Sequence, residues 1–359
     1  MSLRFHAPYM QWAKTRPSAR FDLALSNILG CRLEDLAGAR ETIAFDGRND
    51  NGYQPLIDSI ARRYGVDPVQ VTTASGASGA NFQVCAALLQ PGDDALVERP
   101  GYDPLLGAAR LLGARTIRFD REFDQQYAVD PDRVRAALTP KTRLIIVTSP
   151  HNPTGALTDA AALTEIGRIA ESVGAYVLVD EVYLDASGAS VRPASHLGDR
   201  FISTSSLTKS YGLASLRSGW ALSSPLVAER IRRARDVIDG TGSIVAERLA
   251  TLAFEQLPLL AGRASALLAT NGPIMRDFLS SRPELEWVDT HGTVVFPRIR
   301  GVSDASAFAE RLLAERETAV VPGRFFEAPA HVRLGFGSET DNVRGGLAAL
   351  GAALDARAW

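Results

Sequence analysis

The sequence predicts an α/β fold: a mostly parallel central sheet covered by helices, followed by a smaller α+β domain. From about Val69, short β-branched runs alternate with longer Ala-, Leu- and Arg-rich segments of helical period, which is the pattern of successive βαβ units. The predicted strands, such as "LIIV" and "YVLV", are continuously apolar and therefore suit a sheet buried on both faces. After about Asp239 the pattern changes to two long helices and shorter strands.

The predicted elements follow one another without an internal repeat. Strand "VTTA" precedes helix "GANFQVCAALL", "DALVERP" precedes "PLLGAARLLG", "RTIRF" precedes "DPDRVRAAL", and "RLIIVTSP" precedes "DAAALTEIGRIAESVG", which leads to "AYVLVDEVY". Helices are expected over 245–257 and 259–279, and strands at "HGTVVFPRI" and "HVRLGFG". We therefore divide the chain into an N-terminal arm (1–40) packing near the small domain, a large domain (41–243) and a small C-terminal domain (244–359).

Composition and charge exclude several classes of protein. The net charge is −2, from 39 basic and 41 acidic residues, and no basic run suggests a nucleic-acid partner. Apolar runs are far shorter than the ~20 residues that cross a bilayer, and the N-terminus lacks a signal-peptide apolar region, so we expect a cytoplasmic protein. Cys31 and Cys85 form no CxxC and the five histidines are scattered, so no metal site is expected.

Candidate functional residues follow the predicted strands, where ligands bind in open α/β sheets. In "TASGASGAN", Gly76, Ala77 and Ser78 leave the backbone accessible at the start of a helix, which suits a phosphate. The segment matches neither GxGxxG nor GxxxxGK[ST], and a tight turn remains an equal alternative.

Two further strand ends carry polar side chains. In "TSPHNPTG", Pro150 and Pro153 hold the chain so that Asn152 presents its amide to a ligand, although a polar turn before a helix is an alternative. In "VLVDEVY", Asp180 ends an apolar run, where a carboxylate is costly unless it meets a cation or a donor, and Tyr183 lies three residues on. We therefore expect a positive group to face Asp180.

The stretch "SLTKSYGLASLRSGW" places Lys209 among small hydroxyl residues and glycines. A partly desolvated lysine loses proton affinity and becomes a nucleophile able to form a Schiff base. A solvated surface cation is the alternative, but the chain has just three lysines. In "HVRLGFG", Arg333 has the fork that clamps a carboxylate, although with 36 arginines it would not stand out unaided.

The order and spacing of these motifs resemble a known family. "SPHNPTG", "DEVY" about thirty residues later, and "SLTKSYGLASLRSG" are similar to the signature of the class I and II aminotransferases, pyridoxal-phosphate enzymes of fold type I, the aspartate aminotransferase fold. The resemblance runs over nearly the whole chain.

The resemblance implies roles for individual residues. Lys209 corresponds to the lysine that binds the cofactor as a Schiff base and moves the proton between substrate and cofactor. Asp180 corresponds to the carboxylate that keeps the pyridine nitrogen protonated, and Asn152 and Tyr183 to the residues bonding the phenolic oxygen. Tyr102, in "RPGYDP", corresponds to the aromatic residue stacked on the ring.

The resemblance also implies the two ends of the site. Arg333, with Asn152, corresponds to the anchor of the substrate α-carboxylate, and Ser26, in "LALSNI", falls where the N-terminal arm approaches the substrate. The phosphate cup corresponds to Gly76, Ala77, Ser78, Ser206 and Arg217.

Two departures from the family pattern stand out. The family has a tyrosine that contacts the phosphate of the neighbouring subunit, whereas this chain has Phe45 and Asp46 there, with Tyr53 as a weak substitute. Ser215 replaces a common glycine, which affects nothing essential. The partner-subunit contact is therefore left unassigned.

The resulting hypothesis is an aminotransferase that moves an amino group from an α-amino acid to a 2-oxo acid, with a homodimer implied by the resemblance. A C–S β-lyase, decarboxylase, racemase or cyclase shares these anchors, although a carboxylate clamped by Arg333 argues against decarboxylation. A ligand sensor would need an N-terminal DNA-binding module that the first forty residues do not provide. Asp236 and Asp239 hint at a basic substrate, but two solvated helix-end aspartates are the alternative, and the side chain stays open.

Overall fold

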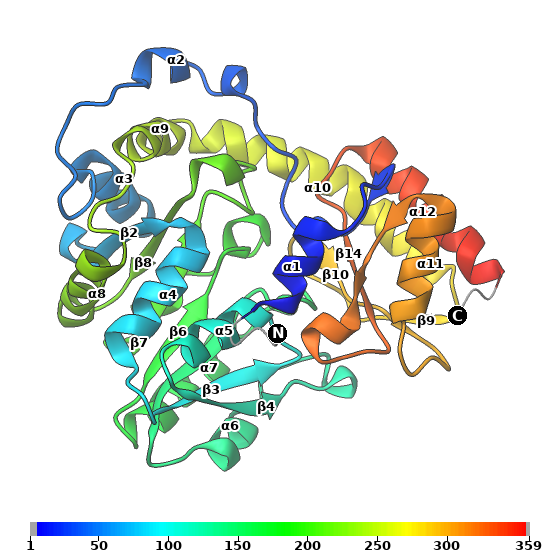
Figure 1. The fold of residues 1–359 in the computed structure, drawn as a ribbon, viewed down its shortest axis with the longest axis horizontal. Coiled ribbons are helices and arrows are strands. Elements are labelled where there is room, and N and C mark those ends of the chain that lie inside the picture. The colour runs from blue at the N-terminus through cyan, green and yellow to red at the C-terminus, as the bar shows by residue number, and fades with distance from the viewer. Residues whose placement is uncertain (1–5, 357–359) are drawn as a thin grey trace.

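The centre of the fold is a seven-stranded sheet with strand order β2-β8-β7-β6-β5-β3-β4 (Figure 1). The structure is a computed structural model that describes residues 6–356. β8 pairs antiparallel with both neighbours and the other pairs are parallel, so the predicted mostly parallel sheet is confirmed. The strands are β2 (Val71–Ser75), β3 (Asp94–Arg99), β4 (Arg115–Asp120), β5 (Thr142–Thr148), β6 (Tyr176–Asp180), β7 (Phe201–Ser206) and β8 (Ser218–Leu222).

Helices cover both faces of this sheet because its strands are apolar on both sides. In β5, Leu144 and Ile146 pack against one helical layer, and Ile145 and Val147 pack against the other. Each fully buried side chain of this size contributes about 1.5–3 kcal/mol. The first layer is α4 (Gly76–Leu88), α5 (Asp103–Leu111) and α8 (Pro225–Ile238), and the second is α6 (Pro131–Ala137) and α7 (Ala160–Glu171).

Two helices connect the sheet to the C-terminal part. α9 (Ile244–Glu255) packs with α3 (Gln54–Tyr64) in a cluster that includes Trp220 of β8. α10 (Leu257–Ser280) then runs from α9 towards the C-terminal helices (Figure 1). The division at residue 243 stays a prediction, and these contacts favour placing α9 with the large domain.

The C-terminal part has the predicted α+β character. Its core includes Phe308, Leu334 and Leu347, which lie between short strands and helices. The short strands form a three-stranded sheet, β10-β14-β13, and a two-stranded sheet, β11-β9. The elements are β9 (Leu285–Glu286), β10 (Val294–Val295), β11 (Arg298–Ile299), α11 (Ser306–Arg316), β13 (Val321–Pro322), β14 (Val332–Gly335) and α12 (Thr340–Asp355).

The N-terminal segment lies across the molecule between these two parts (Figure 1). It contains α1 (Pro8–Thr15), β1 (Phe21–Asp22), which pairs with β12 (Thr318–Ala319), and α2 (Ala39–Thr42). Leu23 is fully buried in the C-terminal core. Within residues 6–356, none of the helices is long and apolar enough to span a membrane.

Candidate active site

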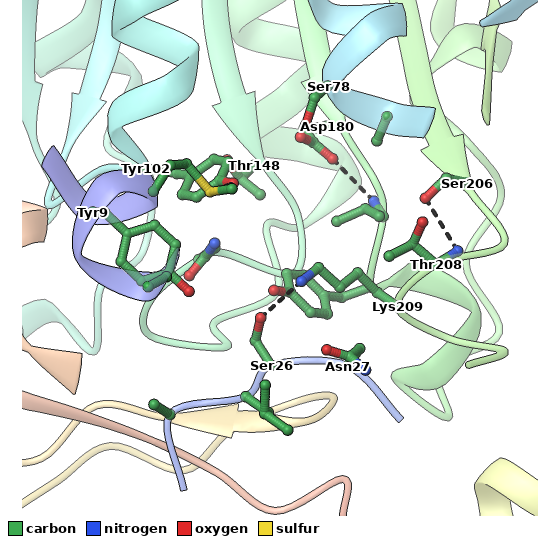
Figure 2. A pocket seen from close by; sticks show the side chains of 18 of the residues that line it. Tyr9, Ser26, Asn27, Ser78, Tyr102, Thr148, Asp180, Ser206, Thr208 and Lys209 are labelled. Carbon is green, nitrogen blue, oxygen red and sulfur yellow. Dashed lines mark hydrogen bonds between the residues drawn. The ribbon is translucent and has the colours of Figure 1, made fainter. Parts of the chain in front are cut away.

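The carboxyl ends of β2, β5, β6 and β7 open onto one cavity of about 470 Å³. α1 and residues 24–27 form its opposite wall (Figure 2). Every sequence-predicted site residue except Gly76 and Arg333 lines the cavity, and those two contact residues that do. The lining residues from the prediction are Ser26, Ala77, Ser78, Tyr102, Asn152, Asp180, Tyr183, Ser206, Lys209 and Arg217.

Lys209 extends into this cavity from the loop after β7. Its Nζ donates a hydrogen bond to Ser26 Oγ at 2.9 Å, and its backbone carbonyl accepts one from Ile28 N at 2.9 Å. Figure 2 shows Ser26 and Lys209 meeting across the cavity. Burial, assisted by the charge of Arg333, lowers the pKa of Lys209 to about 8, although Asp180 opposes the shift. The placement is that of a reactive amine.

Asp180, at the end of β6, is held by neutral donors. Its Oδ2 accepts from Asn81 Nδ2 at 2.7 Å, and its Oδ1 accepts from Val182 N at 3.1 Å. Asn81 Oδ1 in turn accepts from Thr204 Oγ1 at 2.5 Å. Burial raises the pKa of Asp180, and the bond from Asn81 is the main opposing effect.

Within residues 6–356 no cation bonds directly to Asp180, so the expectation that a positive group faces it stays a prediction for a bound ligand. Lys209 acts on Asp180 through its charge, but the groups within hydrogen-bond distance are an amide and a backbone N–H. The physical reason is that donors from the strand end and from α4 satisfy the carboxylate without neutralising it.

Two of the predicted aromatic residues, Tyr102 and Tyr183, line the cavity. Tyr183 is 2% exposed and its hydroxyl has no hydrogen-bond partner among the described residues. Burial raises the pKa of Tyr183 to about 12, although the charge of Arg333 and the nearby Ser26 lower it. Tyr102 packs edge-on against Tyr9, with ring centroids 5.7 Å apart, and its hydroxyl contacts Met10 Sδ at 3.3 Å.

The end of the cavity beside the start of α4 is suited to an anion. α4 begins at Gly76, and no side chain caps its first turn, so backbone N–H groups are free there. A Cβ on Gly76, whose φ is +71°, would lie 2.3 Å from Arg217 Nη2, so glycine lets the guanidinium approach. Arg217 itself has φ +48°, an uncommon backbone conformation for a non-glycine residue and one often found at functional sites.

Arg333, on β14, is fully buried at the other end of the site. Its Nη1 donates to Asn152 Oδ1 at 2.9 Å, and its Nη2 donates to Tyr9 Oη at 2.8 Å and to the Ala24 carbonyl at 2.9 Å. The guanidinium carbon lies 5.1 Å from the ring centres of both Tyr9 and Phe326. Its Nε is buried and has no hydrogen-bond partner among the described residues.

A buried ion pair supports the segment that presents Asn152. Glu98 of β3 accepts from Arg121 Nη1 at 2.8 Å and from Thr148 N at 2.7 Å, and Arg121 Nε donates to the Tyr127 carbonyl at 2.6 Å. His151 Nε2 lies 3.0 Å from the Pro100 carbonyl. These contacts hold the turn after β5 in place.

Three residues of the site were missed at the level of sequence. Tyr9 contacts Arg333 across 324 residues and carries no local signal. Asn81 lies within "TASGASGAN" and is buried. The sequence signal that could have identified it is an amide side chain at the start of a mostly apolar helical segment. Thr208 precedes Lys209 and lines the cavity with a buried, unpartnered hydroxyl.

The remaining predicted positions lie outside this cavity. Phe45 is 88% exposed, and Arg248 lies over the ring of Tyr53, 5.6 Å from its centre. Asp236 pairs with Arg233 at 2.8 Å on the surface of α8. The homodimer and a partner-subunit contact to the phosphate stay predictions.

Comparison with known proteins gives consistent matches over almost the whole chain. A family model described as aminotransferase class I and II matches residues 29–350. The chain is 31% identical to capreomycidine synthase of Streptomyces vinaceus, over 96% of this chain and 92% of that protein. It is 30% identical to arginine–pyruvate transaminase AruH of Pseudomonas aeruginosa, over 79% of this chain and 74% of that protein.

Two solved structures superpose closely on this chain. A PLP-dependent aminotransferase from Streptococcus suis has a TM-score of 0.91 at 28% identity, covering 99% of this chain and 98% of that one. The PLP-dependent cyclase OrfR has a TM-score of 0.88 at 26% identity, covering 100% of this chain and 99% of that one. Both of these proteins are PLP-dependent, that is, dependent on the cofactor pyridoxal phosphate.

The residues present fit this cofactor. The uncompensated carboxylate of Asp180, the unpartnered hydroxyls of Tyr183 and Thr208, and the open N-terminus of α4 are complementary to a pyridine N–H, a phenolic oxygen and a phosphate. Lys209, whose Nζ lies in the cavity beside Ser26, supplies the amine that an aldehyde requires.

Proposed function

This chain belongs to the class I and II aminotransferase family, and we propose that it uses pyridoxal phosphate to move the amino group of an α-amino acid to a 2-oxo acid. The observation that carries the proposal is the position of Lys209, whose amine lies in the cavity under the electrostatic influence of both Asp180 and Arg333. In this proposal Asp180 pairs with the protonated ring nitrogen of the cofactor, and Arg333 pairs with the α-carboxylate of the substrate.

The cofactor and this chain's residues divide the chemistry. When bound, pyridoxal phosphate supplies an electron-poor ring that stabilises negative charge at the substrate Cα. Asp180 holds the proton on the ring nitrogen, and Asn152 and Tyr183 bind the phenolic oxygen. Ser78, Ser206, Thr208, Arg217 and the first N–H groups of α4 hold the phosphate.

Lys209 is the residue that moves a proton at the substrate Cα. Because its pKa is lowered to about 8, more of the amine is neutral near neutral pH than for an ordinary lysine, as a general base requires. Ser26 accepts a hydrogen bond from Nζ and holds it on the cavity side. At the other end, Arg333 binds the α-carboxylate while Asn152 and Tyr9 fix its guanidinium.

A second candidate is a ring-forming reaction on the same cofactor, with a C–S β-lyase as a further variant. The comparison with the cyclase OrfR covers the whole chain, and the identity with capreomycidine synthase covers 96% of it, more than the 79% covered by the transaminase match. All three reactions begin with proton removal at Cα and use the same anchors, so the difference lies in the later steps.

The test supplies the PLP-loaded protein with single amino acids, arginine among them, and no 2-oxo acid. We expect one equivalent of 2-oxo acid per active site and no ammonia, with continuous turnover once a 2-oxo acid acceptor is added. The Lys209→Ala variant is the control and should give neither product.

Other product patterns would reject transamination. Continuous release of ammonia with a 2-oxo acid identifies a lyase, and a cyclic amino acid without any 2-oxo acid identifies the second candidate. Undiminished turnover by Lys209→Ala would exclude the proposed role of that lysine in either case.

A further inference from the structure

Asn81 is one of two buried amide side chains on α4, the other being Gln83. It lies on α4 and is 4% exposed. Its hydrogen-bond partners are Asp180, at the end of β6, and Thr204, in β7. A buried amide requires partners for both its donor and its acceptor, since each unmet group costs about 1–3 kcal/mol. Asn81 finds both, on two adjacent strands.

The hydrogen bonds around Asn81 run in one direction. An ionised carboxylate can accept but not donate, so the amide must present its nitrogen to Asp180, at 2.7 Å, and its oxygen to the Thr204 hydroxyl, at 2.5 Å. Thr204 is fully buried and pairs with Asp180 in the sheet register. Hydrogen bonds that follow one another in this way strengthen the last donor in the chain.

We propose that Asn81, oriented by Thr204, is a positioning residue that holds Asp180 ionised and correctly turned for the cofactor ring nitrogen. The inference rests on the proposed function, which places the ring nitrogen at Asp180. Because Asn81 and Val182 N each engage one carboxylate oxygen, the plane of the carboxylate is fixed before the cofactor arrives. Burial raises the pKa of Asp180, and Asn81 is the largest effect against that rise.

The experiment compares two ligands on variants of the full chain. One is pyridoxal phosphate, and the other is the analogue in which CH replaces the ring nitrogen. A charge-assisted hydrogen bond is worth about 1.5–3 kcal/mol, so Asn81→Leu should weaken pyridoxal phosphate binding by about ten- to a hundredfold and leave the analogue nearly unchanged. Where transamination is measurable, kcat should fall while KM for the amino acid is retained.

Thr204 provides variants that disturb packing less. Thr204→Val, which is nearly isosteric, should weaken pyridoxal phosphate binding in the same selective way but by a smaller factor, and Thr204→Ser should restore it. Gln83→Leu is the matched control, because Gln83 is also buried on α4 and its Oε1 has no partner among the described residues. It should bind both ligands as the unmodified protein does.

Two outcomes would overturn the inference. Equal weakening of both ligands by Asn81→Leu would show a defect of packing, and unchanged affinity for both would show that Asn81 is not coupled to the ring nitrogen. Both readouts depend on cofactor binding and not on turnover, so a failure of transamination in the amino-acid assay leaves them interpretable.

Discussion

Asp180 and Glu98 are both buried carboxylates in the central sheet, but their surroundings differ. Glu98 is 1% exposed and meets the guanidinium of Arg121 at 2.8 Å. Asp180 is 4% exposed and meets the neutral amide of Asn81 at 2.7 Å. Burial raises the pKa of both groups.

This difference in partners distinguishes a carboxylate that stabilises the fold, Glu98, from one that can bind a ligand, Asp180. Glu98 is neutralised inside the chain, and it uses its second oxygen to hold Thr148 N beside the turn that carries Asn152. Asp180 faces a cavity and lacks an ion pair among the described residues, which leaves its charge for a ligand. A buried carboxylate without an internal cation in a cavity is therefore the more informative sign of function.

The largest expected effect is on stability and comes from Glu98→Gln. Removing one member of a buried pair leaves Arg121 as an uncompensated charge, which costs about 3–5 kcal/mol of unfolding free energy. Urea denaturation of the cofactor-free protein measures it. The double variant Glu98→Gln/Arg121→Met should recover most of the loss, and a single-variant loss below about 1 kcal/mol would remove the contrast.

Asp180→Asn should have the opposite profile. Its activity should fall by at least ~10²-fold, because the ring nitrogen loses its charged partner, while the variant still binds the cofactor, with an affinity lowered at least as much as that of Asn81→Leu. The unfolding free energy of the cofactor-free protein should change little, since the variant removes a buried charge that has no direct ion pair, and Lys209, which this charge favours in its protonated form, can lose its proton. Steady-state kinetics and urea denaturation together test this. Near-normal activity would reject the assigned role.

The smallest effect concerns the titration of Lys209. In the cofactor-free protein its ammonium should lose its proton with a midpoint near pH 8, and Asp180→Asn should move the midpoint lower, because the Asp180 charge favours the protonated amine. With just three lysines, reductive ¹³C-methylation and NMR resolve each titration, and Lys209→Ala assigns the signal. A midpoint above 10 would contradict the desolvated placement.

The sequence alone predicts those parts of the fold that local residue patterns determine. The alternation of apolar strands with helices gave the parallel sheet, and the strand ends gave Lys209, Asp180 and Asn152, since strand ends meet at one edge of a sheet. It did not predict that β8 runs against its neighbours, because both directions bury the same apolar residues.

The contacts that complete the site could not be derived in this way. Tyr9 reaches Arg333 from the other end of the chain, and Asn81 reaches Asp180 across 99 residues. Such pairs depend on how the helices pack on the sheet, which no local sequence pattern specifies. The neutral donors at Asp180 were missed for the same reason, because charge balance alone does not reveal which donors packing provides.

The sheet register has a consequence for how this site can diversify. Thr148, Asp180 and Thr204 are direct neighbours across β5, β6 and β7, and a one-residue slip in any of these strands would turn its side chain to the other face. These side chains therefore keep their orientation toward the site only while the core strands keep their register. The wall formed by α1 and residues 24–27 belongs to no strand of that sheet, so substitutions there can reshape the substrate-facing side of the cavity without changing the strand register.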